Sequence, residues 1–250
     1  MKKYWMDHLR FWFQVNIDSG GETAYYLMDK TKCIRKVYFF HSDYSEIDIP
    51  ASVNRMDYMF YYCGSNLNIT YNSGINNIYT SSMFEHVSDI TANMNFRTVI
   101  SSGYMFRGCS GNINLNLNFG VYSNCNNLIS LTGVCYVNIN IYCGVNSTCY
   151  MFFNSSSATV HGNIDLIFRN NAYVYDLFRD TTFAEDSNVN ITLAGSQTNY
   201  QAQLFSGSYI NTNNFNIFCY RTIQHSLGVT VMGHLNFMYP YEDRKSTRLN

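Results

Sequence analysis

The stretch Asn112–Phe119, NINLNLNF, decides the fold of this chain, because asparagine and an apolar residue alternate over all of its positions. A period of two is typical of a β-strand that buries one face and exposes the other. The apolar residues are therefore predicted to point into a core, and the asparagines to form an outer face. Asparagine is a poor strand former in general, so its regular use here indicates a specific role for that face.

The alternating motif recurs along most of the chain. It begins at Asn66 (NLNI), Asn93 (NMNF), Asn112 (NINL), Asn138 (NINI), Asn163 (NIDL), Asn188 (NVNI) and Asn214 (NFNI), with degenerate copies at Glu46 (EIDI) and His234 (HLNF). Successive copies are 19 to 27 residues apart. A connection of that length excludes a tight hairpin, so the strands are expected to pair in parallel. The sequence predicts a β-dominated repeat solenoid of about nine stacked coils, with short helical or turn segments between the strands.

Superposing the copies motif on motif predicts which side chains share the outer face. The third motif position gives one outer column of Asp48, Asn68, Asn95, Asn114, Asn140, Asp165, Asn190, Asn216 and Asn236. The fifth position gives a mixed column that includes Tyr142 and Phe218. Stacked carboxamides can hydrogen-bond from coil to coil as a ladder, and a ladder is compatible with a ligand surface. The candidate binding face is therefore Asn68, Asn95, Asn114, Asn140, Tyr142, Asp165, Asn190, Asn216 and Phe218.

A second motif of Met or Leu followed by Phe falls between the strands. It is clearest as YMFYYC (Tyr58–Cys63) and YMFRGC (Tyr104–Cys109), and its Phe is expected to close the core from the opposite wall. With the strand that follows, as in YMFRGCSGNINLNL, it resembles the BspA-type leucine-rich repeat, in which an MF-x-x-C turn leads into the strand. The resemblance extends over about residues 37–237. The Asn-x-Asn strands, the scarcity of proline and the irregular period depart from it, and leave a right-handed parallel β-helix as the alternative.

The ends of the chain are expected to differ from the repeats. Residues 1–36 are interpreted as an N-terminal cap or flanking segment, and 37–242 as the solenoid domain. The last residues, DRKSTRLN (243–250), match the translation of a sequence resembling a sequencing-library adapter, so they are expected to be a non-biological tail on a chain cut off near Glu242. Asp7, His8 and Arg10 interrupt what would otherwise begin like a signal peptide, and no apolar stretch is long enough to span a membrane.

Charge and motif content argue against several functions. The formal net charge of −1 and the lack of a basic stripe give no support for nucleic-acid binding. Asp48 and Asp165 are expected five coils apart, too far for a glycosidase pair, and no catalytic motif is present, so neither an enzyme nor a cofactor is predicted. The eight cysteines form no CxxC pair; buried thiols are expected and no metal is predicted, with disulfides or a metal site left as alternatives.

These patterns favour a non-enzymatic binding or adhesion scaffold. Members of the BspA-type family are mostly surface or secreted adhesion proteins with no shared catalytic residues, so the resemblance implies a cell-surface, extracellular or virion protein. The expected type is a surface adhesin or a phage receptor-binding protein that presents its Asn- and aromatic-lined face to a glycan or a protein receptor. An intracellular protein-interaction scaffold and a fragment of a polysaccharide-active β-helix enzyme are the alternatives.

Overall fold

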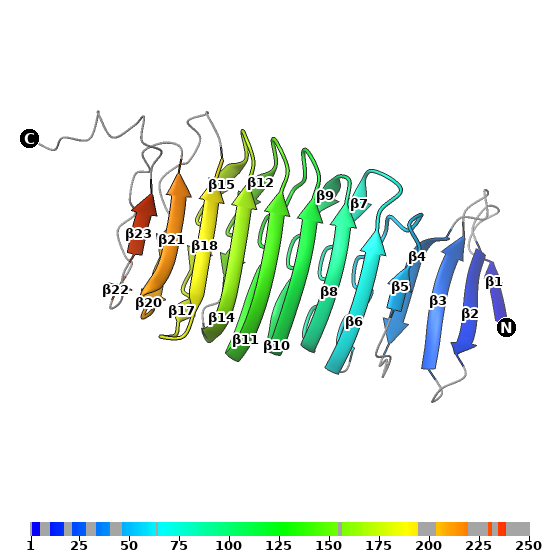
Figure 1. Cartoon of the computed structure of the whole chain (residues 1–250). Helices are drawn as coiled ribbons and strands as arrows, with labels where there is room; N and C mark the ends of the chain where they lie inside the picture. The colour runs from blue at the N-terminus through cyan, green and yellow to red at the C-terminus, as the bar shows by residue number, and fades with distance from the viewer. Residues whose placement is uncertain are drawn as a thin grey trace, which may run out of the picture.

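The computed structural model describes residues 2–5, 11–17, 22–28, 34–40, 47–63, 65–154, 157–194, 204–219, 230–231 and 235–238. Within these residues the chain forms strands and turns but no helix. The expected tail at 243–250 lies outside the described residues. Figure 1 shows two parts: a small sheet at the N-terminal end and a long stack of parallel strands.

The N-terminal sheet is antiparallel. Its four strands are β1 (Lys2–Trp5), β2 (Phe11–Ile17), β3 (Glu22–Met28) and β4 (Ile34–Phe40), paired in chain order. The short links between them suit antiparallel pairing, which needs no crossover. The boundary expected between residues 36 and 37 falls inside β4.

Nine parallel strands make up what we call the sheet wall. They are β5 (Ile47–Ile49), β6 (Ser65–Asn72), β8 (Ser88–Phe96), β10 (Phe106–Phe119), β11 (Ile129–Cys143), β14 (Ser157–Phe168), β18 (Asn188–Leu193), β21 (Asn214–Cys219) and β23 (Leu235–Met238). Each strand pairs in parallel with the next one in this order, from β5 with β6 to β21 with β23. The predicted repeat solenoid is confirmed: the parallel strands stack into a β-solenoid of about seven turns.

The segments that connect successive strands of the sheet wall form the turn side of each coil. Their short strands also pair in parallel from coil to coil. β7 (Ile78–Tyr79) pairs with β9 (Val99–Ser101), and β12 (Thr148–Tyr150) with β15 (Tyr173–Tyr175). Two longer series follow: β13 (Phe153–Asn154) pairs with β16 (Phe178–Arg179) and β16 with β19 (Phe205–Ser206), while β17 (Thr182–Phe183) pairs with β20 (Tyr209–Ile210) and β20 with β22 (Thr230–Val231). In Figure 1 they lie behind and at the ends of the main strands.

The core lies between the sheet wall and the turn side. The predicted inward residues of the sheet wall, such as Ile113, Leu115 and Ile139, are buried, while Ile47 is only half-buried. The Met or Leu and the Phe of the second motif are buried opposite them, as predicted, except that Met151 is only half-buried. Burying one such side chain stabilises the fold by roughly 1.5–3 kcal/mol, so every added coil extends one continuous core.

The motif-on-motif alignment is correct from β11 onward and wrong before it. Asn138 pairs with Asn163, as predicted, but its partner in β10 is Asn114 and not Asn112. Asn93 pairs with Asn116, again not with Asn112. The error has a physical cause: β10 carries several asparagines in alternation, and a slip of two residues keeps every side chain on its own face. The register follows instead from the length of each coil, counted between paired residues of consecutive strands. This length is 22 residues from Asp48 to Thr70 and 26 from Asn190 to Asn216.

The second motif is also a backbone signature. Tyr58 and Tyr62 at its two ends have positive φ angles of 57° and 52°, and Tyr104 and Gly108 repeat the pattern at 58° and 66°. Between these ends the Phe rings stack, with centroids 5.2 Å apart for Phe60 and Phe84 and 4.9 Å apart for Phe84 and Phe106. In these copies two left-handed residues around a buried Met–Phe pair turn the coil back toward the sheet wall.

Candidate functional site

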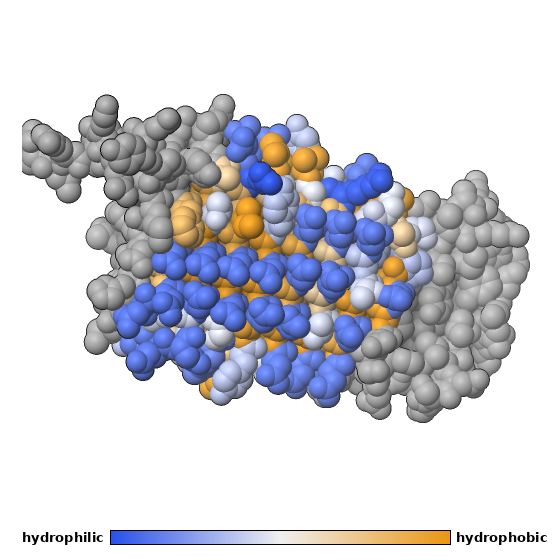
Figure 2. All heavy atoms as spheres, viewed as in Figure 1, coloured by the Kyte–Doolittle hydropathy of each residue, from blue (hydrophilic) through white to orange (hydrophobic). Residues whose placement is uncertain are grey.

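Most outward side chains of the sheet wall form three long columns that we call the polar face. The first column is Asn68, Thr91, Asn114, Asn138, Asn163, Asn188 and Asn214; the second is Asp48, Thr70, Asn93, Asn116, Asn140, Asp165, Asn190 and Asn216; the third is Asn72, Asn95, Asn118, Tyr142, Ile167, Thr192 and Phe218. All of them are exposed or half-buried. Figure 2 shows the result as hydrophilic rows that cross the strands, with hydrophobic residues between them.

All nine predicted face residues lie on the polar face, but three of them lie outside their predicted column. Asn140, Asp165, Asn190 and Asn216 share the second column with Asp48, as expected. Asn68 and Asn114 belong to the first column and Asn95 to the third, which corrects their predicted place. Tyr142 and Phe218 also lie in the third column.

Hydrogen bonds join the carboxamides of neighbouring coils, so the predicted asparagine ladder is present. In the second column the Nδ2 of Asn116 donates to the Oδ1 of Asn93 at 3.2 Å, and that of Asn216 to the Oδ1 of Asn190 at 3.0 Å. The first column repeats this from Asn138 to Asn114 (3.2 Å), and the third from Asn95 to Asn72 (3.1 Å). In each of these bonds the later coil donates to the earlier one.

The ladder leaves part of each carboxamide unused. An asparagine side chain has two N–H donors and an oxygen with two lone pairs. Asn190, which donates to Asp165 and accepts from Asn216, uses one donor and one lone pair for its two neighbours, so one of each remains on its carboxamide. Because the neighbours hold the amide plane in place, the polar face offers a fixed array of paired donors and acceptors with a strand spacing of about 4.8 Å.

The third column changes character along the solenoid. It begins with three asparagines in β6, β8 and β10 and continues with Tyr142, Ile167 and, after Thr192, Phe218. The Nε of Arg169 donates to the Tyr142 hydroxyl at 2.7 Å, and its guanidinium lies 5.2 Å from the ring centroid. The two contacts fix the ring, so that a partly apolar edge borders the carboxamides.

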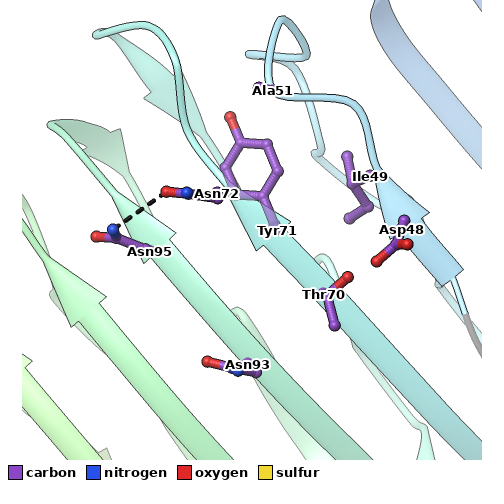
Figure 3. Close-up of a pocket in the computed structure, with 8 residues that line it drawn as sticks. All are labelled: Asp48, Ile49, Ala51, Thr70, Tyr71, Asn72, Asn93 and Asn95. Carbon is purple, nitrogen blue, oxygen red and sulfur yellow. Dashed lines mark hydrogen bonds between the residues drawn. The ribbon is translucent and has the colours of Figure 1, made fainter.

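A hollow of about 450 Å³ opens at the N-terminal end of the polar face. It is lined by Asp48, Ile49, Ala51, Thr70, Tyr71, Asn72, Asn93 and Asn95 (Figure 3). It forms because β5 ends at Ile49, its last pair being with Tyr71, whereas β6 continues to Asn72. Of its lining residues the predicted binding face included only Asn95, since the length of β5 is not visible in the repeat pattern.

The polar face holds few charges. In the second column Asp48 and Asp165 are five strands apart, which at about 4.8 Å a strand is roughly 24 Å. A glycosidase pair needs roughly 5–10 Å, so these two carboxylates cannot act together. His161, which lies before Asp165 in β14, contacts Asp186 of the next coil, with 2.8 Å between its Nδ1 and the Asp186 Oδ1.

Asp176 is one of two buried carboxyl groups on the described turn side, the other being Glu85. Its Oδ1 has no hydrogen-bond partner among the described residues, and burial raises the pKa of this group, with Arg179 lowering it and Asp180 raising it further. Asp176 is the first left-handed residue of its copy of the second motif, with φ of 51°. Its position is explained by that turn, and it lies off the polar face.

A group that the sequence prediction missed is a cluster of three cysteines. The Sγ atoms of Cys125, Cys143 and Cys149 all lie within 4.8 Å of one another. All six cysteines whose side chains are described are buried and outside any disulfide, which confirms the expected buried thiols for these six. Spacing rules for metal motifs do not detect the cluster. The signal that could have done so is the 24-residue separation of Cys125 and Cys149, one coil length, which places them at the same point of consecutive coils.

In the described part of the chain, no helix qualifies as a membrane span. Comparisons of the chain with protein-family models, with curated proteins and with solved structures find no match.

Proposed function

We propose that this protein is a non-enzymatic binding scaffold and that its polar face binds a neutral glycan. The observation that carries the proposal is the array of outward carboxamides, in which even Asn190, bonded to both neighbouring coils, keeps one donor and one acceptor. A sugar hydroxyl both donates and accepts, so it can satisfy such a pair without leaving a polar group unpaired. The proposal fits a surface adhesin or a virion receptor-binding protein.

Three properties of the face favour a glycan over other ligands. The near-absence of charge favours a neutral partner over an acidic one. The ladder fixes the carboxamides before binding, which reduces the ordering cost of association. Tyr142 and Phe218, beside the carboxamides, offer ring surface to the apolar face of a sugar. The hollow next to Asp48 and Thr70 lies within the roughly 300–1,000 Å³ of small-ligand sites, which suits a chain end or a single residue of the glycan.

The test is affinity electrophoresis of the purified chain in gels that contain mannan, galactan, a neutral β-glucan or polygalacturonate. We expect at least one neutral polysaccharide to retard the protein. The double variant Asn116→Ala/Asn140→Ala, which removes adjacent carboxamides of the second column, should bind at least tenfold more weakly, a loss of about 1.4 kcal/mol or more. The control is Asn170→Ala, an exposed asparagine of the turn side.

Three results would contradict the proposal: no retardation by any glycan, an equal loss in Asn170→Ala, or the release of reducing ends, which would make the protein an enzyme. Thermal melts of each variant separate lost binding from lost folding, since the exposed ladder bonds are worth only about 0.5–1.5 kcal/mol each.

A protein-interaction scaffold is the second candidate, and an aromatic cluster on the turn side favours it. Tyr58, Tyr61 and Tyr62 are exposed, and the Tyr62 ring stacks on His86 with centroids 4.5 Å apart. Exposed tyrosines of this kind are enriched in protein interfaces. If a protein is the partner, binding should survive Asn116→Ala/Asn140→Ala and be lost in Tyr62→Ala.

A further inference from the structure

The three-cysteine cluster brings together segments from two coils. Cys143 is the last residue of β11, Cys149 lies in β12, and Cys125 lies in the turn after β10. The backbone N–H of Cys125 donates to the Thr148 carbonyl at 2.8 Å, which holds Cys125 beside β12. All three side chains have no exposed surface. The thiols therefore meet inside the core, near the edge where the sheet wall turns back.

In neighbouring coils the corresponding positions are larger and apolar. Cys143 pairs with Phe119 on one side and Phe168 on the other, and Cys149 pairs with Val174. The stack of Phe96 on Phe119, with centroids 5.1 Å apart, ends at Cys143. Cysteines thus stand at adjoining core positions where the neighbouring coils have apolar side chains. This substitution is confined to one part of the solenoid.

The hydrogen bonds among the thiols are not equivalent. Burial raises the pKa of Cys125 and Cys149 well above the ordinary thiol value. Burial also acts on Cys143, but hydrogen bonds from Cys125 and Cys149 outweigh it and lower the pKa of Cys143. The three thiols thus interact directly with one another inside the core.

We propose that Cys125, Cys143 and Cys149 form a three-coordinate site for the soft monovalent ion Cu(I). Thiolate sulfur selects Cu(I), zinc and iron–sulfur centres over the hard cations. Structural zinc takes four ligands, and no fourth histidine, cysteine or carboxylate of the described residues joins the group. Metal–sulfur bonds of about 2.3 Å in a trigonal plane separate the sulfurs by about 4.0 Å. The sulfurs already lie within 4.8 Å, so a contraction of less than 1 Å completes the site.

Cu(I) at this place would join three segments that only hydrogen bonds and packing otherwise hold. Binding releases thiol protons and couples to folding, because the unfolded chain has no preformed site. A ligand that binds the folded state alone raises the apparent stability. The site is independent of the polar face, so glycan binding and copper binding are separate properties.

Because the sulfurs are buried, the test loads the metal during refolding. The reduced full-length chain is refolded without oxygen, with or without one equivalent of Cu(I), and then passed through gel filtration with a Cu(I) chelator. We expect about one Cu(I) per chain to be retained, a thiolate-to-copper absorption band in the ultraviolet, and a higher melting temperature than that of the metal-free protein.

Two matched variants decide the assignment. Cys149→Val and Cys135→Val each introduce the residue that the following coil has at the paired position, Val174 and Val160, so both are expected to fold. Copper retention should fall at least tenfold in Cys149→Val and stay unchanged in Cys135→Val, a buried cysteine outside the cluster.

The proposal is overturned if the wild-type chain retains no Cu(I), or if Cys149→Val retains as much as wild type, because the metal would then sit on other cysteines. It is equally overturned if mass spectrometry of the unreduced native protein finds a disulfide between two of the three cysteines.

Discussion

The sheet wall and the turn side both repeat from coil to coil, but the sheet wall repeats its side chains and the turn side repeats its backbone conformation. On the sheet wall the side chains repeat: aliphatic residues point inward, and asparagine recurs outward in columns that hydrogen-bond from coil to coil. On the turn side the backbone conformation repeats. Left-handed positions recur at Tyr104 and Gly108, at Ser82 and His86, and in other copies with unrelated side chains.

This difference indicates which part of the molecule is available for function. A wall that is specified by its backbone leaves its outward side chains free to vary, and the exposed turn residues of this chain do vary. A wall whose exposed chemistry is uniform over many coils presents one extended surface. Asparagine has no advantage as a strand former, so its recurrence is explained by the ladder and by the surface that the ladder holds in place.

The strongest test of the sheet wall is Ile139→Asn. Ile139 has no exposed surface and lies in β11 between Leu115 and Ile164. Asparagine there loses packing and buries an amide without a partner, so we expect the free energy of unfolding to fall by about 3–6 kcal/mol in chemical denaturation. Ile139→Val is the control and should lose about 0.5–1.5 kcal/mol. Equal losses in the two variants would mean that the inner face is assigned wrongly.

The matching test of the turn side is Gly108→Ala. Gly108 has φ of +66°, and an added Cβ would lie 2.6 Å from the Nδ1 of His86. The left-handed conformation costs a non-glycine residue about 1–2 kcal/mol, and the His86 ring must also move, so we expect a loss of about 2 kcal/mol in thermal or chemical denaturation.

Gly103→Ala is its control on the same turn. A Cβ at Gly103 meets nothing within 4 Å, so this variant should change stability by no more than about 1 kcal/mol, in the stabilising direction. If both variants lose the same amount, side-chain contacts and not backbone conformation specify this wall.

Much of the architecture can be predicted from the sequence because a period of two has a direct physical meaning. Ile113, Asn114 and Leu115 fall on their predicted faces, and the parallel pairing follows from the length of each connection. The register cannot be obtained in the same way. In β10 each shift by two residues exchanges one asparagine for another, and only the length of the turns, which the alternation does not encode, decides between them.

The candidate site likewise has a part that the sequence predicts and a part that it does not. The nine predicted face residues need only the correct side of the strand, and all of them have it. The hollow beside Asp48 depends on where β5 ends, and the thiol cluster depends on which turn residue packs under which strand. Cys125, Cys143 and Cys149 come together through coil stacking, so a rule based on short spacings does not find them.

The smallest effect we predict compares the same substitution on the two parts of the coil. Tyr122 and Tyr136 are both exposed, at 67% and 57%, but Tyr122 lies in a turn with φ of 57° and Tyr136 lies in β11. Asn146, one coil after Tyr122, also has a left-handed φ of 59°. Asparagine tolerates this conformation better than tyrosine does, so Tyr122→Asn should raise stability by about 0.5–1 kcal/mol.

Tyr136→Asn should lower stability by about as much, because asparagine is the poorer strand former and because the Tyr136 ring stacks on His161 with centroids 5.1 Å apart. The two variants should therefore change the free energy of unfolding in opposite directions in paired denaturation curves. That result would show that backbone conformation decides the effect of an asparagine on the turn side, and cross-strand contact decides it on the sheet wall. If both variants lose a similar amount of stability, this distinction is wrong, because the left-handed position would then show no preference for asparagine over tyrosine.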